Sequence, residues 1–485
     1  MINLIGNELK KVFKKKTIYI LLIIIVGYIL LSNIMIKITD SGYQYNYYYE
    51  GDLEYYQDLI AELDPDNPAQ FPDFAECKRN IETLELTKKY GNNTWQAYVI
   101  NTKLTGYIDT LIEYEYSDGV TEEAYKTAKA EYDEAIKRLD SDDWKYFANK
   151  DIEFAQKSLD EQYALLENSK NSEATTEINR VISNLKLEIQ INKWRLDKNI
   201  SYAPSFLNSS IEQYYSYQTN LNNYIGTNIE NLSGDEYQYY QNSLENASLN
   251  KYYIENNISL DSNSRDLFIN LFGNYELFIL IVGIVIAGSI VSEEFNRGTI
   301  KLLLVKPYSR VKIILSKFIV CMLILILTIA FIYVFQFLAG GVINGFDGMN
   351  IPAVVYNFDT SAVETVNLFA YVALIGICKL PMYVLLTTLA FTCSTLFTNT
   401  ALAVSMPFLG YIGSSIINQL ALLYDIKQVI YFVTPNWDLS CYLFGGSPLF
   451  KELTPTFSII VCVIYLIIML VLNCIVFKKR DIKNI

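Results

Sequence analysis

Long apolar runs alternate along the chain with segments rich in Lys, Asp and Glu. A helix that crosses a bilayer needs about 20 mainly apolar residues, because the hydrocarbon layer is about 30 Å thick and each helical residue adds about 1.5 Å. The first run lacks the A-x-A cleavage site of a signal peptide, so we expect it to be retained. The pattern predicts six membrane spans, at residues 17–36, 267–291, 313–338, 367–391, 400–420 and 456–477.

Residues 1–16, before the first span, have the pattern of an amphipathic helix. Apolar side chains fall on one helical face and lysines on the others, and the apolar set is Ile2, Ile5, Leu9, Val12 and Phe13. This pattern is typical of a helix that lies in the membrane interface. The alternative is a short soluble helix that precedes the first span.

A long polar segment, residues 37–266, separates the first two spans. Residues 120–200 are rich in Ala, Glu, Lys and Leu, which favours helix. Tyr125, Ala128, Tyr132, Ala135 and Leu139 have the spacing of one buried helical face. We therefore predict a mostly α-helical domain, built as an antiparallel hairpin or a small bundle. Tyrosines crowd both ends of the segment, either as an aromatic contact surface or as filling for the helical core.

The charges of the chain are segregated. Of 52 acidic and 39 basic residues in 485, the segment 41–265 holds 39 acidic and 20 basic, a net charge of −19. The rest holds 13 acidic and 19 basic, a net charge of +6. An acidic polar block within a basic apolar frame is not the composition of one soluble globule, and nothing in it indicates a nucleic-acid partner.

The positions of Lys and Arg predict the orientation, because cytoplasmic loops are enriched in them. Basic clusters lie in residues 10–16, in 297–317 and in the tail 478–485. With six spans, all three clusters fall on one side, the cytoplasm. We therefore expect an all-α, polytopic six-helix protein of the bacterial cell membrane with both termini cytoplasmic. A large, mostly helical extracellular insertion would lie between spans 1 and 2, with further extracellular segments at 339–366 and 421–455.

The composition argues against an enzyme. Histidine, the commonest general base and metal ligand, is absent, and the seven cysteines show no C-x-x-C spacing. We predict no catalytic residue, no metal site and no cofactor on this chain. A disulfide framework is not expected, although the pairing of Cys77 with Cys441 is left open.

The connector at residues 292–312, between the second and third spans, combines charge with breaks in helix. Gly298 allows a turn or a helix end, Pro307 blocks helix continuation, and Ser309 is placed to cap the third span. A small apolar patch, 302–305, lies amid positive charge. We interpret the connector as a compact, partly helical docking surface for another protein. The alternative is an ordinary basic loop.

The sequence "EEFNRGTIKLLLVKPYSRVKIILSKF" resembles the signature of bacterial ABC-2 type transporter permeases, and the tail "FKKRDI" resembles their C-terminal ends. The resemblance covers the six-span frame, about half of the chain. It implies that the connector and the start of the third span form the surface that couples to an ATPase. Its residues here are Glu293, Glu294, Gly298, Thr299, Lys301, Leu303, Pro307, Ser309, Arg310 and Lys317.

The resemblance also implies partners. The chain has no G-x-x-x-x-G-K-[ST] phosphate loop, so ATP and Mg²⁺ would be bound by separate ABC ATPase subunits. A second permease, identical or not, would complete the transporter, and membrane lipid would surround it. The expected function is export, with antimicrobial peptides, drugs and other amphipathic compounds as candidate substrates. The insertion departs from the plain family pattern and leaves the substrate open. The rival hypothesis is a sensor or tether whose external helices bind a ligand or the cell wall.

A few polar side chains fall within the spans. Lys379 lies near the middle of span four, where a charge costs about 2.5–3.5 kcal/mol, so it should face the bundle or a wet cavity, or else reach towards an interface. We place Lys379, Gln336 and Asn418 on a candidate translocation path. Gln336, Asn418 and Asn473 are also expected to join helices by hydrogen bonds, and Glu276 is expected near the interface.

Overall fold

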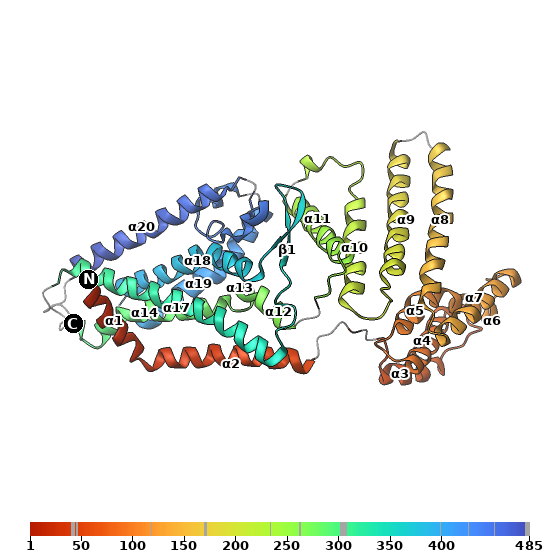
Figure 1. Cartoon of the computed structure of the whole chain (residues 1–485), viewed down its shortest axis with the longest axis horizontal. Helices are drawn as coiled ribbons and strands as arrows, with labels where there is room; N and C mark the ends of the chain where they lie inside the picture. The colour runs from red at the N-terminus through yellow and green to blue at the C-terminus, as the bar shows by residue number, and fades with distance from the viewer. Residues whose placement is uncertain are drawn as a thin grey trace. The chain divides into compact units, whose positions relative to one another are not determined.

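The computed structural model describes residues 1–39, 44, 47–117, 119–168, 172–232, 234–260, 263–300, 308–397, 399–424, 426–450 and 452–480 (Figure 1). The chain divides into two compact units. The membrane unit comprises Met1–Asp40 and Ser262–Ile485, and the inserted unit comprises Ser41–Asp261. The insertion is therefore a separate structural body, as the charge segregation indicates.

Six helices in the described part of the chain are long and apolar enough to cross a membrane, which confirms the predicted fold class. They belong to the membrane unit, with a long helical region between the first and the second. Their bounds are α2 Lys16–Thr39, α14 Glu276–Ile290 with α15 Ser292–Asn296, α17 Arg310–Asn344, α18 Leu368–Leu396, α19 Thr400–Leu423 and α20 Pro455–Lys479.

Helix α14 is the most enclosed of these spans, with ten of its 15 residues buried. It packs against α17, α18 and α19. Gly283 permits the close approach of α18, because a Cβ atom at this position would lie 2.4 Å from Oγ1 of Thr387. Small residues serve the same purpose between membrane helices generally. The second span is therefore the central element of the bundle.

The predicted second span, 267–291, is not one helix. Helix α12 (Asn263–Ile269) and helix α13 (Leu271–Asn274) precede α14, and the chain turns at Asn270 and Tyr275. The prediction was wrong because apolar side chains continue through the turn. The carbonyl of Asn270 accepts hydrogen bonds from the N–H groups of Gly273 and Asn274, which closes α13 as a separate turn.

Helix α1 (Ile2–Phe13) lies where the amphipathic start was expected, but its faces differ from the prediction. Leu4, Glu8 and Val12 are buried against the bundle, whereas Ile2 is 84% exposed and Phe13 42% exposed. The five apolar residues predicted for one face are thus divided between buried, partly buried and exposed positions. A helix with about 3.6 residues per turn brings Leu4, Glu8 and Val12 into line.

A short antiparallel hairpin interrupts the region predicted as the loop 339–366. Strand β1 (Ala353–Asn357) pairs with strand β2 (Ala362–Val366), and Ala353 faces Val366 in the register. Val and Tyr side chains favour such strands, and Ser361 adopts a φ of 53° in the turn. The sequence reading did not predict this hairpin. The region 421–455 contains the 3-10 helices η2 (Lys427–Tyr431) and η3 (Leu439–Gly445).

The inserted unit is helical in its described residues, apart from turns. Helices α8 and α9 lie side by side as an antiparallel hairpin, and α10 packs on α11 (Figure 1). The helix bounds are α3 Glu50–Ile60, α4 Phe71–Tyr90, α5 Trp95–Lys103, α6 Thr105–Tyr116, α7 Glu122–Asp140, α8 Trp144–Asn168, α9 Ser172–Lys198, α10 Phe206–Asn222, η1 Ile229–Asn231 and α11 Gly234–Glu255.

The core of the inserted unit confirms the face predicted on α7. Ala128, Ala135 and Leu139 are buried, and the tyrosines at 125 and 132 are partly buried beside them. Among the tyrosines that crowd the ends of the segment, Tyr49 is 68% exposed and Tyr55 is 60% exposed. The two alternatives raised for these tyrosines stay predictions.

Candidate functional site

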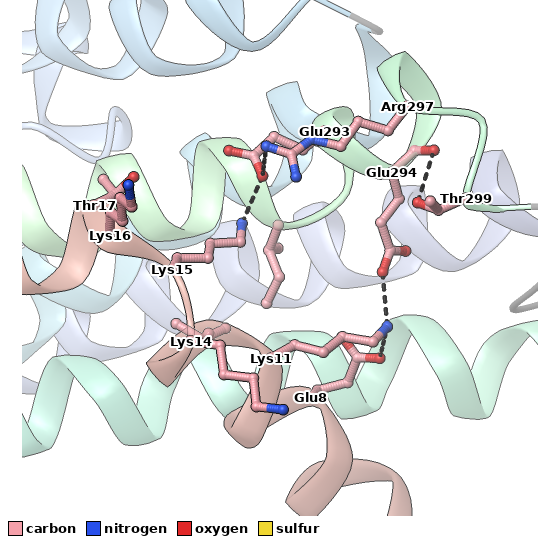
Figure 2. Close-up of a pocket in the computed structure, with 12 residues that line it drawn as sticks. Glu8, Lys11, Lys14, Lys15, Lys16, Thr17, Glu293, Glu294, Arg297 and Thr299 are labelled. Atoms are coloured by element: carbon pink, nitrogen blue, oxygen red, sulfur yellow. Dashed lines mark hydrogen bonds and ion pairs between the residues drawn. The ribbon is translucent and has the colours of Figure 1, made fainter.

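Four charged side chains form a closed ring between α1, the connector and α17. Nζ of Lys317 lies 2.7 Å from Glu8 and 2.9 Å from Glu294, and Nζ of Lys11 lies 2.9 Å from Glu8 and 3.0 Å from Glu294. Figure 2 shows Lys11 reaching towards both carboxylates. Each lysine therefore bridges the same two carboxylates, and two positive charges balance two negative ones.

The ring is deeply buried on the side of the helical bundle. The side chain of Lys317 is fully buried, that of Glu8 is 5% exposed and that of Glu294 is 14% exposed. Lys317 also donates to the carbonyl of Ile290, at 3.4 Å. Removing one member of such a pair leaves an uncompensated buried charge, at a cost of about 3–5 kcal/mol. The ring therefore joins the start of the connector to α1 and α17.

The surroundings shift the pKa values of the two ring members on α1. Burial raises the pKa of Glu8, but the charges and hydrogen bonds of Lys317 and Lys11 outweigh it, so the net shift is downward. Burial lowers the pKa of Lys11, but hydrogen bonds and charge from Glu8 and Glu294 raise it overall. Both groups are therefore charged at neutral pH.

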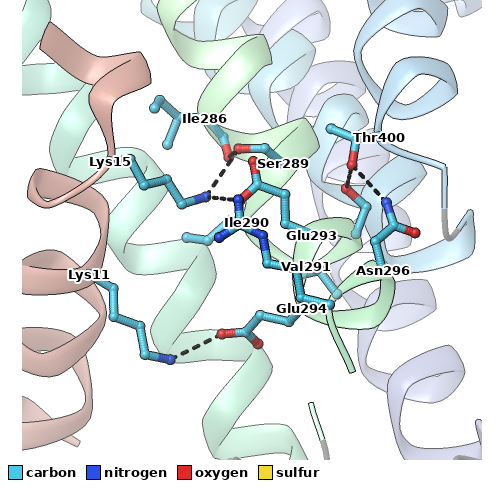
Figure 3. A network of polar contacts seen from close by, with 12 residues as sticks. Lys11, Lys15, Ile286, Ser289, Ile290, Val291, Glu293, Glu294, Asn296 and Thr400 are labelled. Carbon is cyan, nitrogen blue, oxygen red and sulfur yellow. Dashed lines mark hydrogen bonds and ion pairs between the residues drawn. The ribbon is translucent and has the colours of Figure 1, made fainter. Parts of the chain in front are cut away.

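A second ion pair fastens the connector to the turn between α1 and α2. Nζ of Lys15 lies 2.9 Å from the carboxylate of Glu293 and donates to Oγ of Ser289 at 3.5 Å (Figure 3). Arg297, whose side chain is 74% exposed, lies 3.9 Å from the same carboxylate. The two adjacent glutamates of the connector thus pair with two different lysines of the N-terminal segment.

Neutral hydrogen bonds attach the same part of the connector to α18 and α19. Oγ of Ser394 accepts from the N–H groups of Val291 and Ser292. Thr400 shares a hydrogen bond of 2.9 Å with the hydroxyl of Ser292 and accepts from Asn296 (Figure 3). The start of the connector is therefore joined to α1, α17, α18 and α19.

The far end of the connector is joined to the C-terminal end of α20. The hydroxyl of Ser309 caps α17 by accepting from the N–H of Lys312, as predicted. Arg310 donates to the carbonyls of Lys478 and Arg480 at 3.1 and 2.9 Å. The guanidinium of Arg480 in turn lies 4.3 Å from the ring centre of Phe295. Arg310 thus forms hydrogen bonds within the chain.

The structure places the predicted coupling residues in different surroundings. Glu294 pairs with Lys317 in the ring, whereas Glu293 pairs with Lys15. Gly298 adopts a φ of 67°, which is the turn expected of it. Oγ1 of Thr299 donates to the carbonyl of Glu294 at 3.5 Å. Three members of the signature, Lys301, Leu303 and Pro307, lie outside the described residues.

Sequence reasoning missed Glu8, Lys11 and Lys15 as members of the site. Apart from the contact between Glu8 and Lys11, which are three residues apart, their partners lie at least 274 positions away, so local spacing does not reveal the contact with the connector and the bundle. One signal was present, because Glu8 falls between Leu4 and Val12 on a single helical face. An acidic residue between two apolar ones on a face that packs against a bundle indicates a buried cationic partner.

A second charged cluster joins Lys379 of α18 to Glu276, the first residue of α14, and to Asp438, which precedes η3. Nζ of Lys379 is 2.6 Å from Glu276 and 3.3 Å from Asp438, and Tyr411 donates to Glu276 at 2.7 Å. The side chains of Lys379 and Glu276 are 16% and 17% exposed. Of the two alternatives for Lys379, the structure supports a paired group that faces the bundle. Its pairing with Glu276 was not foreseen.

The polar residues predicted to join helices do so in two of three cases. Gln336 of α17 bonds with Asn33 of α2, and Asn473 of α20 bonds with Thr392 and Thr395 of α18. Asn418 accepts instead from Thr434, in the segment that follows its own helix. These bonds give the three side chains structural partners. Their assignment to a translocation path stays a prediction.

The described residues contain no group of three or more His, Cys, Asp or Glu side chains that could hold a metal ion. All seven cysteines lie within the described parts of the chain and are free thiols. The charged contacts of the site are ion pairs between helices, and they hold the start of the connector against α1 and α17.

Residues 240–483, just over half of the chain, match the family described as "Protein of unknown function (DUF2705)". The chain belongs to the DUF2705 family. The matched range contains the whole connector, Lys317 and the cluster at Lys379, but neither α1 nor most of the inserted unit.

Two relatives from Bacillus subtilis (strain 168) support this membership. The protein named "Uncharacterized protein YhcI" is 33% identical over 242 residues, which are 50% of this chain and 76% of the relative. The protein named "Uncharacterized membrane protein YdbK" is 34% identical over 200 residues, 41% of this chain and 76% of the relative. Both relatives are therefore shorter than this chain. With six candidate spans, the chain is a multi-pass membrane protein. No solved structure matches it.

Proposed function

We propose that this chain is the membrane-spanning permease subunit of an ATP-driven ABC exporter, powered by a separate ATPase that binds ATP and Mg²⁺. The end of the bundle that carries α1, the connector and the last residues of α20 faces the cytoplasm. The inserted unit lies outside the cell, and a second permease completes the transporter. The substrate class is an amphipathic compound such as a peptide or drug.

The ion-pair ring is the observation that carries this proposal. When a motor subunit pulls on the connector, the displacement of the connector must reach the spans. A flexible loop would absorb that displacement. Here Glu294 ties the connector to Lys317 of α17 and Lys11 of α1 in a largely buried network. Displacement of the connector would therefore move α17 and α1 together, which is how packed helices transmit a change of state.

The exposed part of the connector supplies the contact surface for the motor. Arg297 is 74% exposed at the side chain, and Tyr308 is 38% exposed. A cation and an aromatic ring at the surface are among the residue types enriched in protein interfaces. The ring thus forms the rigid base, and these side chains form the outer face.

The test is capture of the full chain from its native membrane, followed by identification of the bound proteins. The proposal predicts an ATPase with a G-x-x-x-x-G-K-[ST] motif, and a loss of about tenfold or more in its recovery when Arg297→Glu removes an interface cation. Lys157→Glu, at an exposed position of the inserted unit, is the matched charge reversal and should leave recovery unchanged.

Two outcomes would count against the proposal. In one, no such ATPase is recovered with the unaltered chain, while soluble or cell-wall ligands bind the inserted unit, as a sensor or tether would require. In the other, the ATPase is recovered equally with Arg297→Glu, so the contact lies elsewhere.

A further inference from the structure

A pocket of about 620 Å³ lies beside the ion-pair ring, where α1 ends and α2 begins. Its wall comes from α1, from the turn into α2 and from the connector (Figure 2). Since α2 is a candidate membrane span that starts at Lys16, the pocket lies at the depth where a span enters the bilayer. Lipid headgroups occupy this depth.

Positive charge exceeds negative charge on the pocket wall. Its carboxylates are Glu8, Glu293 and Glu294, and each of them pairs with a lysine. Lys14 and Lys16 are exposed, and neither forms an ion pair with another residue that the structure describes. The five cations of the wall are Lys11, Lys14, Lys15, Lys16 and Arg297. The wall therefore has a surplus of two positive charges, and the buried Lys317 behind it adds a third.

Apolar side chains are exposed along α2, the helix whose first residues line the pocket. Tyr19 and Ile20 are each 56% exposed, and Ile23 is 67% exposed. Phe13, at the end of α1, is 42% exposed on the same stretch of chain. A ligand that fits both surfaces carries an anionic group at one end and long apolar chains at the other.

We propose that this pocket binds the headgroup of an anionic phospholipid. The phosphodiester lies against Lys14 and Lys16, and the acyl chains follow the exposed side of α2. Free phosphate would use the lysines but not the apolar surface, so the occupant is a lipid. Because Arg297 and Thr299 of the connector line the same pocket, occupancy by the lipid acts directly on the position of the connector.

The test measures lipid retained by the purified full chain, using native mass spectrometry after exposure to defined vesicles. Phosphatidylglycerol vesicles are compared with phosphatidylcholine vesicles. A lysine near a charged membrane surface strengthens binding roughly fivefold, so Lys14→Gln with Lys16→Gln should weaken phosphatidylglycerol binding about 30-fold. The pair Lys14→Arg with Lys16→Arg keeps the charge and should keep the binding.

The matched control removes the same charge elsewhere at this end of the bundle. Lys478→Gln with Lys479→Gln alters two exposed lysines at the end of α20, outside the pocket. This control should bind phosphatidylglycerol as the unaltered chain does. Helicity by circular dichroism and a single peak in size-exclusion chromatography show that each variant is folded.

Three results would overturn the proposal. They are equal retention of the two lipids by the unaltered chain, an equal loss of phosphatidylglycerol in the two glutamine pairs, and displacement of the lipid by inorganic phosphate alone. The measurement uses the chain without any ATPase. A negative result for lipid binding would therefore leave the proposed permease function standing. Failure to recover an ATPase would likewise leave the lipid proposal standing.

Discussion

The carboxylate of Glu8, in the first helix, lies 2.7 Å from the ammonium group of Lys317, in the third membrane span. The two residues are 309 positions apart, and the lysine side chain is fully buried. Between them they join the N-terminal helix to the bundle, and Glu294 brings the connector into the same contact.

Removing the buried lysine should destabilise the membrane unit strongly. Lys317→Met leaves Glu8 and Glu294 without their shared partner, so we expect a loss of about 3–5 kcal/mol in the free energy of unfolding. Denaturant unfolding of the purified chain in micelles measures it. Lys312→Met, at an exposed position of the same helix, should change stability by less than about 0.5 kcal/mol. Equal losses of stability from the two substitutions would show that the ring contributes nothing to the free energy of unfolding.

The stability that Glu8 contributes should depend on pH in the acid range. Its pKa in the folded chain lies below the ordinary value of 4.5, so the contribution is complete above that value and is lost as the pH falls through the lowered pKa. The difference in stability between the unaltered chain and Glu8→Gln should therefore be constant between about pH 7 and pH 5 and shrink in more acid solution. A difference that already fades above pH 5 would contradict the ring geometry.

Lys379 and Glu276 should behave as an energetically coupled pair. Lys379→Met and Glu276→Gln are each expected to destabilise the chain, because either change leaves a largely buried charge without its closest partner. The double variant should cost less than the sum of the two, with a coupling energy of about 0.5–3 kcal/mol. Asp438→Asn should have a smaller effect, since Asp438 lies 3.3 Å from Lys379 and its side chain is 37% exposed. Strict additivity of the first two substitutions would refute the pairing.

The close contact between α14 and α18 should tolerate no added methyl group. A Cβ atom on residue 283 would lie 2.4 Å from Oγ1 of Thr387, so Gly283→Ala should cost about 1–3 kcal/mol. Thr387→Ala in the same chain removes the clashing atom and should restore most of the loss. Gly413→Ala, where nothing lies within 4 Å of the added atom, should leave stability unchanged or raise it by up to about 1 kcal/mol. Failure of the second substitution to rescue the first would disprove the contact.

Sequence patterns predicted the spans because each is a long, mainly apolar run that the bilayer forces into helix. The start of α14 escaped prediction because Leu271 and Phe272 are as apolar as the span itself, although the chain turns there. The β1–β2 hairpin escaped because two five-residue strands leave only a weak pattern. Both are local effects that hydropathy does not resolve.

The sequence predicted some residues of the candidate site but not the others. The connector was singled out by its glutamates, glycine and proline, and Lys317 by its place in the same signature. The ring that gives these residues a shared role needs Glu8 and Lys11, which become neighbours of the connector only when α1 packs on α17. A contact of this kind depends on tertiary packing, and the position of Glu8 between Leu4 and Val12 indicates a buried partner without identifying it.

The account depends on the connector touching a motor subunit inside the cell. A photoreactive amino acid at position 297 of the full chain, in its native membrane, tests this contact directly, with position 157 of the inserted unit as the control. The account predicts a cross-link from position 297 to an ATPase that carries a phosphate-binding loop, and none from position 157. An ATPase cross-linked only from position 157, or labelling of position 297 by a membrane-impermeant reagent added outside intact cells, would contradict it.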